Sequence, residues 1–321
     1  MTALIEVGSV SKQFGSIRAV DSVSFTVNRG EVLGFLGPNG AGKSTTMRII
    51  TGFLTPTSGS ASVCGYDLAE EGIAARARLG YLPEGSPLYG EMTALEFLRF
   101  TASVRGLSTS KVAERIKWVV GQLGLGPVLA QPIETLSKGF KRRVGLAQSV
   151  LHDPDVLILD EPTDGLDPNQ KHEVRGLIRT MSAHKAIIIS THLLEEVDAV
   201  CTRAMVINHG KVIVDCTPDE LASMSRYRNA VTVCASTSSG GDLRVTLEGL
   251  AGVSSVEHVP KATVSNRFIA FPKDGKSIVG EVTRHLQEKG WEIEELEVDG
   301  GRLDEVFRDL TTTGSAKKPL H

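Results

Sequence analysis

A glycine-rich segment near residue 40 carries a pattern with a direct chemical meaning. Its nine residues are Gly37, Pro38, Asn39, Gly40, Ala41, Gly42, Lys43, Ser44 and Thr45. They match G-x-x-x-x-G-K-[ST], in which glycines let backbone N–H groups turn inward around phosphate oxygens. A helical pattern over 45–51 follows, so a helix N-terminus adds partial positive charge. The segment therefore predicts binding of a nucleoside triphosphate, with Lys43 on the β- and γ-phosphates and the Ser44 hydroxyl on Mg²⁺.

Two carboxylates directly follow an apolar segment of strand length. Residues 156–159 read Val-Leu-Ile-Leu and lead directly into Asp160 and Glu161. In phosphate-loop enzymes an aspartate at a buried strand end holds Mg²⁺, so we expect that role for Asp160. Glu161 is then placed to polarise the attacking water as a general base, a role worth about 10²–10⁴ in rate. His192 follows the next predicted strand, 186–190, and can reach the γ-phosphate region from there.

The acidic residues and the histidine need strands whose ends lie next to each other. The segments 156–159 and 186–190 have strand length, and a helical pattern over 172–181 separates them. Strand, helix and strand at this spacing form a βαβ unit, so the two strands are predicted to be parallel. Residues 31–36 give another nearly continuous apolar strand, as expected for one covered on both faces. From 93 to 151 the pattern becomes helical, which predicts a helical insertion within an α/β domain.

The composition changes near Arg226, and the remaining chain predicts a smaller α+β domain. Its expected order over 230–298 is strand, helix, strand, strand, helix, strand, which is the ferredoxin-like order. A last helix is predicted over 303–310, and the residues after it have no periodicity. The expected domains are 1–225 for nucleotide binding, 226–311 as an accessory domain, and 312–321 as a disordered tail.

Further segments resemble the ordered motifs of the ABC transporter ATPases. The segment Leu136-Ser137-Lys138-Gly139-Phe140 resembles the signature motif, usually written LSGGQ, and lies between the glycine-rich loop and Asp160. The other matching positions are Gly165-Leu166-Asp167 at the D-loop, His192 at the switch histidine, Tyr81-Leu82-Pro83-Glu84 at the Q-loop, and Phe14 where an aromatic ring stacks on adenine. Together these motifs cover residues 4–215.

The resemblance implies a phosphate-loop NTPase core of the α/β class, with an antiparallel β subdomain and a helical insertion. It also implies a head-to-tail dimer with two ATP molecules at the shared interface. Ser137, Gly139 and Asp167 are then nucleotide-binding residues, with the signature helix offered to the γ-phosphate that the other protomer holds. The residue types fit, because Ser137 is a good N-cap for a helix starting at Gly139 and a helix N-terminus binds anions.

This chain departs from the family pattern at several positions. Glu84 stands where glutamine is usual, and its carboxylate can still bind Mg²⁺. Lys138 and Phe140 replace a glycine and a glutamine of the signature, whereas the serine and glycine expected at the phosphate are kept. The basic run 141–143 after the signature is expected to form a solvated helix face.

The signature segment, the YLPE segment and the long C-terminal extension together resemble the ABC-2 type exporter branch, in which ATPase and permease are separate chains. The resemblance implies ATP and Mg²⁺ as cofactors and ATP hydrolysis coupled to export. It implies a separate integral-membrane permease as partner, and pairing of the ATPase with a second copy or with a sibling chain. The expected location is the cytoplasm, peripheral on the inner face of the cell membrane.

The composition agrees with a membrane partner that is a separate protein. No apolar run approaches the ~20 residues needed to cross a bilayer, and the N-terminus lacks the pattern of a signal peptide. The net charge of -3 argues against nucleic acid as the main partner. The four cysteines are scattered, which favours free thiols in a reducing compartment.

Two other functions remain open from the sequence. A soluble ABC ATPase that acts on ribosomes, DNA or chromatin shares these motifs, but such proteins usually carry two cassettes, a long coiled coil or zinc-binding cysteines. The second alternative is an NTP-binding regulatory module without transport. In that case the segment 226–311 would serve as a ligand-sensing domain.

Overall fold

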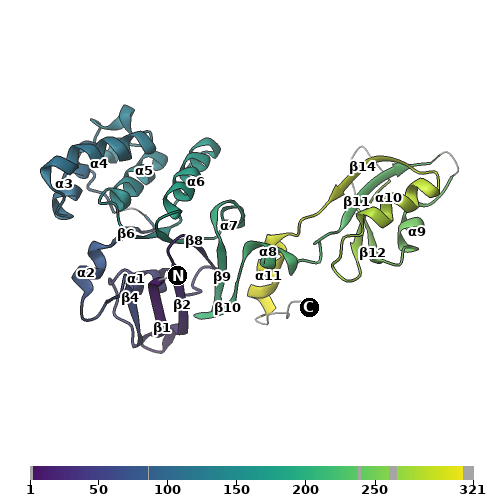
Figure 1. Ribbon diagram of the computed structural model, residues 1–321, viewed down its shortest axis with the longest axis horizontal. Coiled ribbons are helices and arrows are strands. Elements are labelled where there is room, and N and C mark those ends of the chain that lie inside the picture. Colours follow the sequence, from purple (N-terminus) through teal and green to yellow (C-terminus); the bar gives the residue numbers. More distant parts are fainter. Residues whose placement is uncertain (1–2, 86, 238–239, 260–265, 314–321) are drawn as a thin grey trace. The chain divides into compact units, whose positions relative to one another are not determined.

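The computed structural model describes residues 3–85, 87–237, 240–259 and 266–313. The chain separates into two compact units, Met1–Pro218 and Asp219–His321 (Figure 1). The units divide after Pro218, whereas the sequence predicts a boundary after residue 225. The difference comes from the short helix α8 (Pro218–Ser223), which falls almost entirely in the second unit.

A six-stranded sheet forms the centre of the first unit. Its strands, in spatial order, are β10 (Lys211–Cys216), β9 (Arg203–Asn208), β3 (Val32–Leu36), β8 (Ala186–Thr191), β7 (Val156–Asp160) and β6 (Leu79–Leu82). All neighbours are parallel except β9 and β10, which form an antiparallel pair. Every residue of β3, β7 and β8 is buried, as their continuous apolar sequences predict. Helix α6 (Pro168–Ser182) connects β7 to β8, so the predicted βαβ unit is confirmed.

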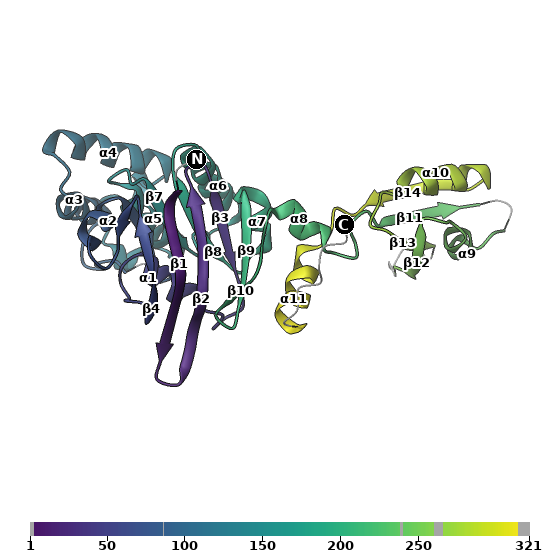
Figure 2. The same ribbon diagram turned by 60° about the horizontal axis from the view of Figure 1, so that its bottom comes forward.

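A smaller antiparallel sheet packs beside the central one. Its strands, in spatial order, are β2 (Ile17–Asn28), β1 (Ala3–Phe14), β4 (Ser58–Val63) and β5 (Tyr66–Asp67). Figure 2 shows β1 and β2 as a long hairpin. One cluster of buried apolar side chains joins this hairpin to helix α1 (Lys43–Ile50) and to the central sheet. Within it the rings of Phe25 and Phe35 lie 5.8 Å apart, so the two sheets share a core.

The helical insertion expected over 93–151 is present. It contains α3 (Ala94–Val104), α4 (Thr109–Gln122), two short 3-10 turns and α5 (Lys138–Val150), which Figure 1 shows grouped together. Thr93 starts α3 in a capping box with Glu96. Two further short helices belong to this unit, α2 (Gly72–Ala77) and α7 (Leu194–Val200).

The second unit has the ferredoxin-like order expected from the sequence. Its elements are β11 (Val231–Ser236), α9 (Leu243–Glu248), β12 (Val253–His258), β13 (Arg267–Pro272), α10 (Val279–Glu288) and β14 (Glu292–Val298). The strands form an antiparallel sheet in the order β12-β13-β11-β14. Side chains of α9 and α10 share one apolar core with Val231 and Val233, so both helices cover the same face of the sheet.

The last helix is longer than predicted. Helix α11 runs over Leu303–Thr313 rather than 303–310, and the hydroxyls of Thr311 and Thr312 donate to backbone carbonyl oxygens of its preceding turn. Residues 312–313 are therefore helical, which corrects the start of the expected disordered tail. The rest of that expected tail, 314–321, lies outside the described residues. Across the described ranges, no helix combines the length and the apolar character needed to span a membrane.

Candidate nucleotide-binding site

A cavity of about 500 Å³ lies where the loop after β3 meets the end of β7. The lining residues are Phe14, Ala19, Pro38, Asn39, Gly40, Gly42, Lys43, Ser44, Thr45, Glu84, Asp160 and Glu161. All except Ala19 are among the residues predicted from the sequence to bind nucleotide or metal, or to catalyse. Gly37 and Ala41 belong to the same loop but do not line the cavity. The fold thus brings together segments separated by more than one hundred residues of chain.

The glycine-rich loop needs glycine where backbone segments approach each other closely. A Cβ at Gly37 would lie 2.5 Å from the carbonyl oxygen of Ile207, and one at Gly42 would lie 2.5 Å from that of Ala19. Gly42 also has a φ of 109°, a left-handed conformation that side chains disfavour. The loop leads directly into α1, which begins at Lys43. The free N–H groups of the first turn of α1 therefore belong to the same loop that lines the cavity.

The Lys43 ammonium is buried in this loop. Its Nζ donates to the carbonyl oxygens of Gly37 (2.6 Å) and Pro38 (3.1 Å). Burial lowers the pKa of Lys43, and the negative charges of Glu161 and Asp160 oppose that shift. A cation held between backbone carbonyls and nearby acids is a suitable partner for phosphate oxygens.

The predicted catalytic residues meet at the adjacent ends of β7 and β8. His192 Nδ1 lies 2.8 Å from Glu161 Oε1, and the Glu161 side chain is only 15% exposed. Burial raises the pKa of Glu161, while the contact with His192 and the charge of Lys43 lower it. Glu161 has a φ of 52°, a left-handed conformation that is uncommon for a residue other than glycine. The pair can therefore accept a proton at Glu161 with His192 holding the carboxylate.

Oxygen ligands for Mg²⁺ occur in the same cavity. The Ser44 hydroxyl and the carboxylates of Glu84 and Asp160 all contribute to its lining. Within the described ranges no group of three or more His, Cys, Asp or Glu side chains is arranged to hold a metal by itself. Mg²⁺ that is shared with nucleotide phosphates needs only one or two carboxylates from the protein. The donor set therefore fits Mg²⁺ bound together with a nucleotide.

Three further predicted nucleotide-binding residues, which belong to neither the glycine-rich loop nor the cavity lining, lie at the N-terminal ends of two helices. Ser137 caps α5 by accepting a hydrogen bond from the Phe140 backbone N–H (3.3 Å), and α5 begins at Lys138 rather than at Gly139. Asp167 caps α6 in a capping box with Gln170. A Cβ at Gly139 would lie 2.9 Å from Gln170 Oε1, so the two helix ends are packed together.

The sequence predicts that residues 141–143 form a solvated helix face, and this prediction is wrong for two of the three residues. Arg142 is 6% exposed and Arg143 is 7% exposed. Arg143 donates to the Leu123 carbonyl oxygen (3.0 Å) and to Glu173 (2.9 Å). The sequence does not show which residues of a basic run are buried and which are exposed. The packing of α5 against β6 and α4 decides this.

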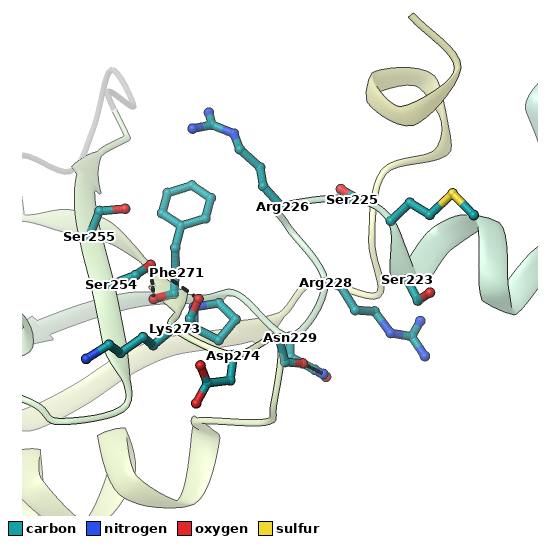
Figure 3. A pocket seen from close by; sticks show the side chains of 13 residues that line it. Ser223, Ser225, Arg226, Arg228, Asn229, Ser254, Ser255, Phe271, Lys273 and Asp274 are labelled. Carbon is teal, nitrogen blue, oxygen red and sulfur yellow. Dashed lines mark hydrogen bonds between the residues drawn. The ribbon is translucent and has the colours of Figure 1, made fainter. Parts of the chain in front are cut away.

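A second cavity of about 500 Å³ lies within the second unit. It is lined by residues 223–226, 228–229, 254–255 and 271–275. Three cations contribute to it, Arg226, Arg228 and Lys273, but Figure 3 shows their side chains pointing in different directions. Arg226 is already paired with Glu257 (3.0 Å) and Glu305 (3.2 Å). This cavity therefore does not direct its charged groups toward one point.

Comparisons with known proteins assign most of the first unit to one family. Residues 20–164 match the ABC transporter family. The chain is 41% identical over 223 residues to a probable multidrug ABC transporter ATP-binding protein of Escherichia coli, and the match covers 69% of this chain but only 38% of that protein. It is 36% identical to a Nod factor export ATP-binding protein of Cupriavidus metallidurans, with 69% of this chain and 73% of the relative covered.

Solved structures show the same fold. An ATP-binding subunit of an ABC transporter superposes with a TM-score of 0.65 at 33% identity, covering 69% of this chain and 92% of the other. A dimeric bacterial ABC transporter cassette superposes with a TM-score of 0.63 at 22% identity, covering 67% and 98%. These likenesses confirm the predicted α/β phosphate-loop NTPase fold of the first unit.

Proposed function

The chain belongs to the family of ABC transporter ATP-binding proteins, and from this premise we propose that it binds and hydrolyses Mg-ATP in the cavity of its first unit. The observation that carries the proposal is the Glu161–His192 pair, 2.8 Å apart, next to a phosphate loop with a buried lysine. A loop that only bound nucleotide would not need a hydrogen-bonded carboxylate at the end of the adjacent strand.

Each residue has a defined task in the proposed reaction. Lys43 and the N–H groups of the loop bind the phosphates, and the exposed ring of Phe14 supports the adenine. Glu161 accepts a proton from the water that attacks the γ-phosphorus, while His192 orients that carboxylate. The bond from the γ-phosphorus to the bridging oxygen breaks, which leaves ADP and inorganic phosphate. Mg²⁺ held by Ser44, Asp160 and Glu84 would supply charge neutralisation at the phosphates.

The position of the signature residues supports pairing of two chains. Ser137, Gly139 and Asp167 lie outside the cavity, on packed helix ends. Such a surface becomes useful if it closes over the cavity of a second copy or of a sibling chain, where the helix N-termini face the γ-phosphate. ATP would then hold the two protomers together until it is hydrolysed.

An apolar groove of the first unit supports docking of an integral-membrane permease. The groove has a volume of about 620 Å³ and lies between the core and the helical insertion. Large apolar side chains stay exposed along it, namely Phe53 (73%), Ile73 (82%), Tyr89 (56%), Phe100 (42%) and Val104 (69%). An exposed apolar groove of this kind accepts an amphipathic helix. The chain would thus reside in the cytoplasm at the inner face of the membrane and drive export through that permease.

Steady-state ATP hydrolysis tests the chemistry. Lys43→Ala and Glu161→Gln should each lower kcat by about 10²-fold or more, because they remove phosphate binding and proton acceptance. Lys117→Ala and Glu114→Gln on the exposed face of α4 are matched controls and should hydrolyse ATP like the wild type. Wild-type rates in the first two variants would refute the mechanism.

Affinity purification tests the partner. The tagged chain is recovered from detergent-solubilised membranes of its host, and proteins that come with it are identified by mass spectrometry. A stoichiometric multi-span membrane protein, lost when Phe53 and Tyr89 are replaced by serine, is the expected result. Recovery only with ribosomes or nucleic acid would leave the ATPase standing and overturn the transport assignment.

A further inference from the structure

Arg142 is a buried cation that donates to backbone carbonyl groups close to the cavity. Its Nη1 donates to the Pro83 carbonyl oxygen (2.9 Å). Its Nε and Nη2 donate to the Glu161 carbonyl oxygen (3.1 and 2.6 Å), and Nη2 also contacts that of Asp160. One guanidinium on α5 thus joins the residue before Glu84 to both residues of the acidic strand end. A buried charge is costly to desolvate, and an arrangement that accepts this cost requires an explanation.

The contact with Pro83 belongs to a regular series along the edge of the central sheet. Strand β6 is the last strand on its side of the sheet that the described residues form, so its outward carbonyl groups face no further strand of that sheet. Side chains from α5 and the residues just after it contact every second carbonyl group along β6 and on the residue that follows it. The contacts are His152 Nε2 with the Leu79 carbonyl oxygen (3.1 Å), Gln148 Nε2 with that of Tyr81 (2.8 Å), and Arg142 Nη1 with that of Pro83.

The contact with Glu161 fixes a backbone that is held in an uncommon conformation. Glu161 has a φ of 52°, and such a conformation persists only where the surroundings determine it. Its N–H donates to the Ser190 carbonyl oxygen (2.8 Å), and its carbonyl oxygen accepts from Arg142 and from the Asp164 N–H (3.1 Å). Both sides of this residue are therefore tied, one by β8 and the other by α5.

We propose that Arg142 is a positioning residue for ATP hydrolysis: by bonding the Pro83 and Glu161 carbonyls together, it sets the separation between Glu84 and the general base. The planar fork of a guanidinium spans two carbonyl groups in different segments, and a lysine ammonium does not hold the same geometry. The proposal rests on the hydrolysis proposed above, and it concerns kcat rather than ATP binding because Arg142 does not line the cavity.

The test compares Arg142→Gln and Arg142→Lys with Gln148→Leu in the full chain. Gln148→Leu removes a similar bond between the same helix and strand, but one step further from the cavity. We expect both Arg142 variants to lower kcat about 10–10²-fold while the KM for ATP changes little, since small misplacements of catalytic groups have effects of that size. Gln148→Leu should lower the melting temperature and leave kcat near the wild-type value.

The outcomes are distinguishable. The stoichiometry of bound fluorescent ATP analogue reports the folded fraction, so kcat is expressed per competent site. If Arg142→Gln does not fold, Arg142→Lys decides, because it keeps the buried charge. A wild-type kcat per site in a folded Arg142 variant, or an equal loss in Gln148→Leu, would overturn the inference. A wild-type chain that does not hydrolyse ATP at all would instead reject the proposed function.

Discussion

The nucleotide cavity of the first unit and the cavity of the second unit have the same volume, about 500 Å³ each, and differ in how their charged groups are arranged. In the first unit a buried ammonium, a loop of backbone donors and two strand-end carboxylates all belong to one lining. In the second unit Arg226 is paired with glutamates, and Lys273 points elsewhere. The comparison teaches that convergence of groups rather than volume makes a site, because a ligand is bound by donors aimed at one place.

The largest effect on ATP affinity should come from a substitution that distorts the glycine-rich loop of the first cavity. In Gly42→Ala the new Cβ would lie 2.5 Å from the Ala19 carbonyl oxygen at a φ of 109°, so the loop must shift. We expect the Kd for ATP to rise at least about tenfold, equivalent to ~1.4 kcal/mol, as measured by isothermal titration calorimetry. Gly30→Ala is the matched control, since its φ of 89° carries similar strain but a Cβ there meets nothing within 4 Å. Unchanged ATP affinity in Gly42→Ala would show that the loop does not bind the phosphates.

An intermediate effect is expected when His192 is replaced, in the acidic part of the curve of kcat against pH. A general base acts only when deprotonated, so hydrolysis falls as the pH drops through the pKa of Glu161. Burial raises that pKa, and the hydrogen bond from His192 lowers it. His192→Ala removes the lowering contact, so the acid limb of kcat should move to higher pH, in addition to a lower maximal rate.

The control for this prediction is His172→Ala, because His172 is exposed on α6. Its acid limb should coincide with that of the wild type. A limb that stays in place in His192→Ala, or moves to lower pH, would contradict the role given to the Glu161–His192 contact.

The smallest effect is expected in the second cavity. The double variant Arg226→Ala and Lys273→Ala removes two of its cations. ATP hydrolysis and ATP affinity should nevertheless stay within about twofold of wild type. The free energy of unfolding should change by ~1 kcal/mol or less, because exposed ion pairs contribute little. Thermal unfolding and steady-state kinetics measure both. A large loss of ATP hydrolysis would mean that the second cavity takes part in the function, and the contrast between the cavities would no longer hold.

The residues of the first cavity were predictable because their chemistry is local. Lys43 and Ser44 stand in a contiguous motif, and Asp160 and Glu161 follow a strand whose apolar run is unambiguous. Ala19 has no such signal: it lines the cavity only because the β1–β2 hairpin passes beside the loop. Pattern and spacing within one segment thus identify a site, while contacts between distant segments complete it.

Strand β4 escaped prediction because its apolar signal is weak. It reads Ser-Gly-Ser-Ala-Ser-Val, with only Ala61 and Val63 as alternating apolar residues, and pairing with β1 makes it a strand. The burial of Arg142 escaped for a related reason, since the direction in which α5 faces is decided by β6. The pairing of β4 and the burial of Arg142 both depend on contacts with distant segments, which outweigh the local conformational preference of the sequence.

The series of side chains along β6 has a consequence for solubility. An uncovered edge of a buried parallel sheet would offer its carbonyl groups to a strand of another molecule, which is how aggregation through sheet edges begins. Because Gln148 and Arg142 occupy these carbonyls, no incoming strand can pair there without displacing α5. Helix α5, which covers the β6 edge of the sheet, therefore also keeps neighbouring molecules from adding a strand there.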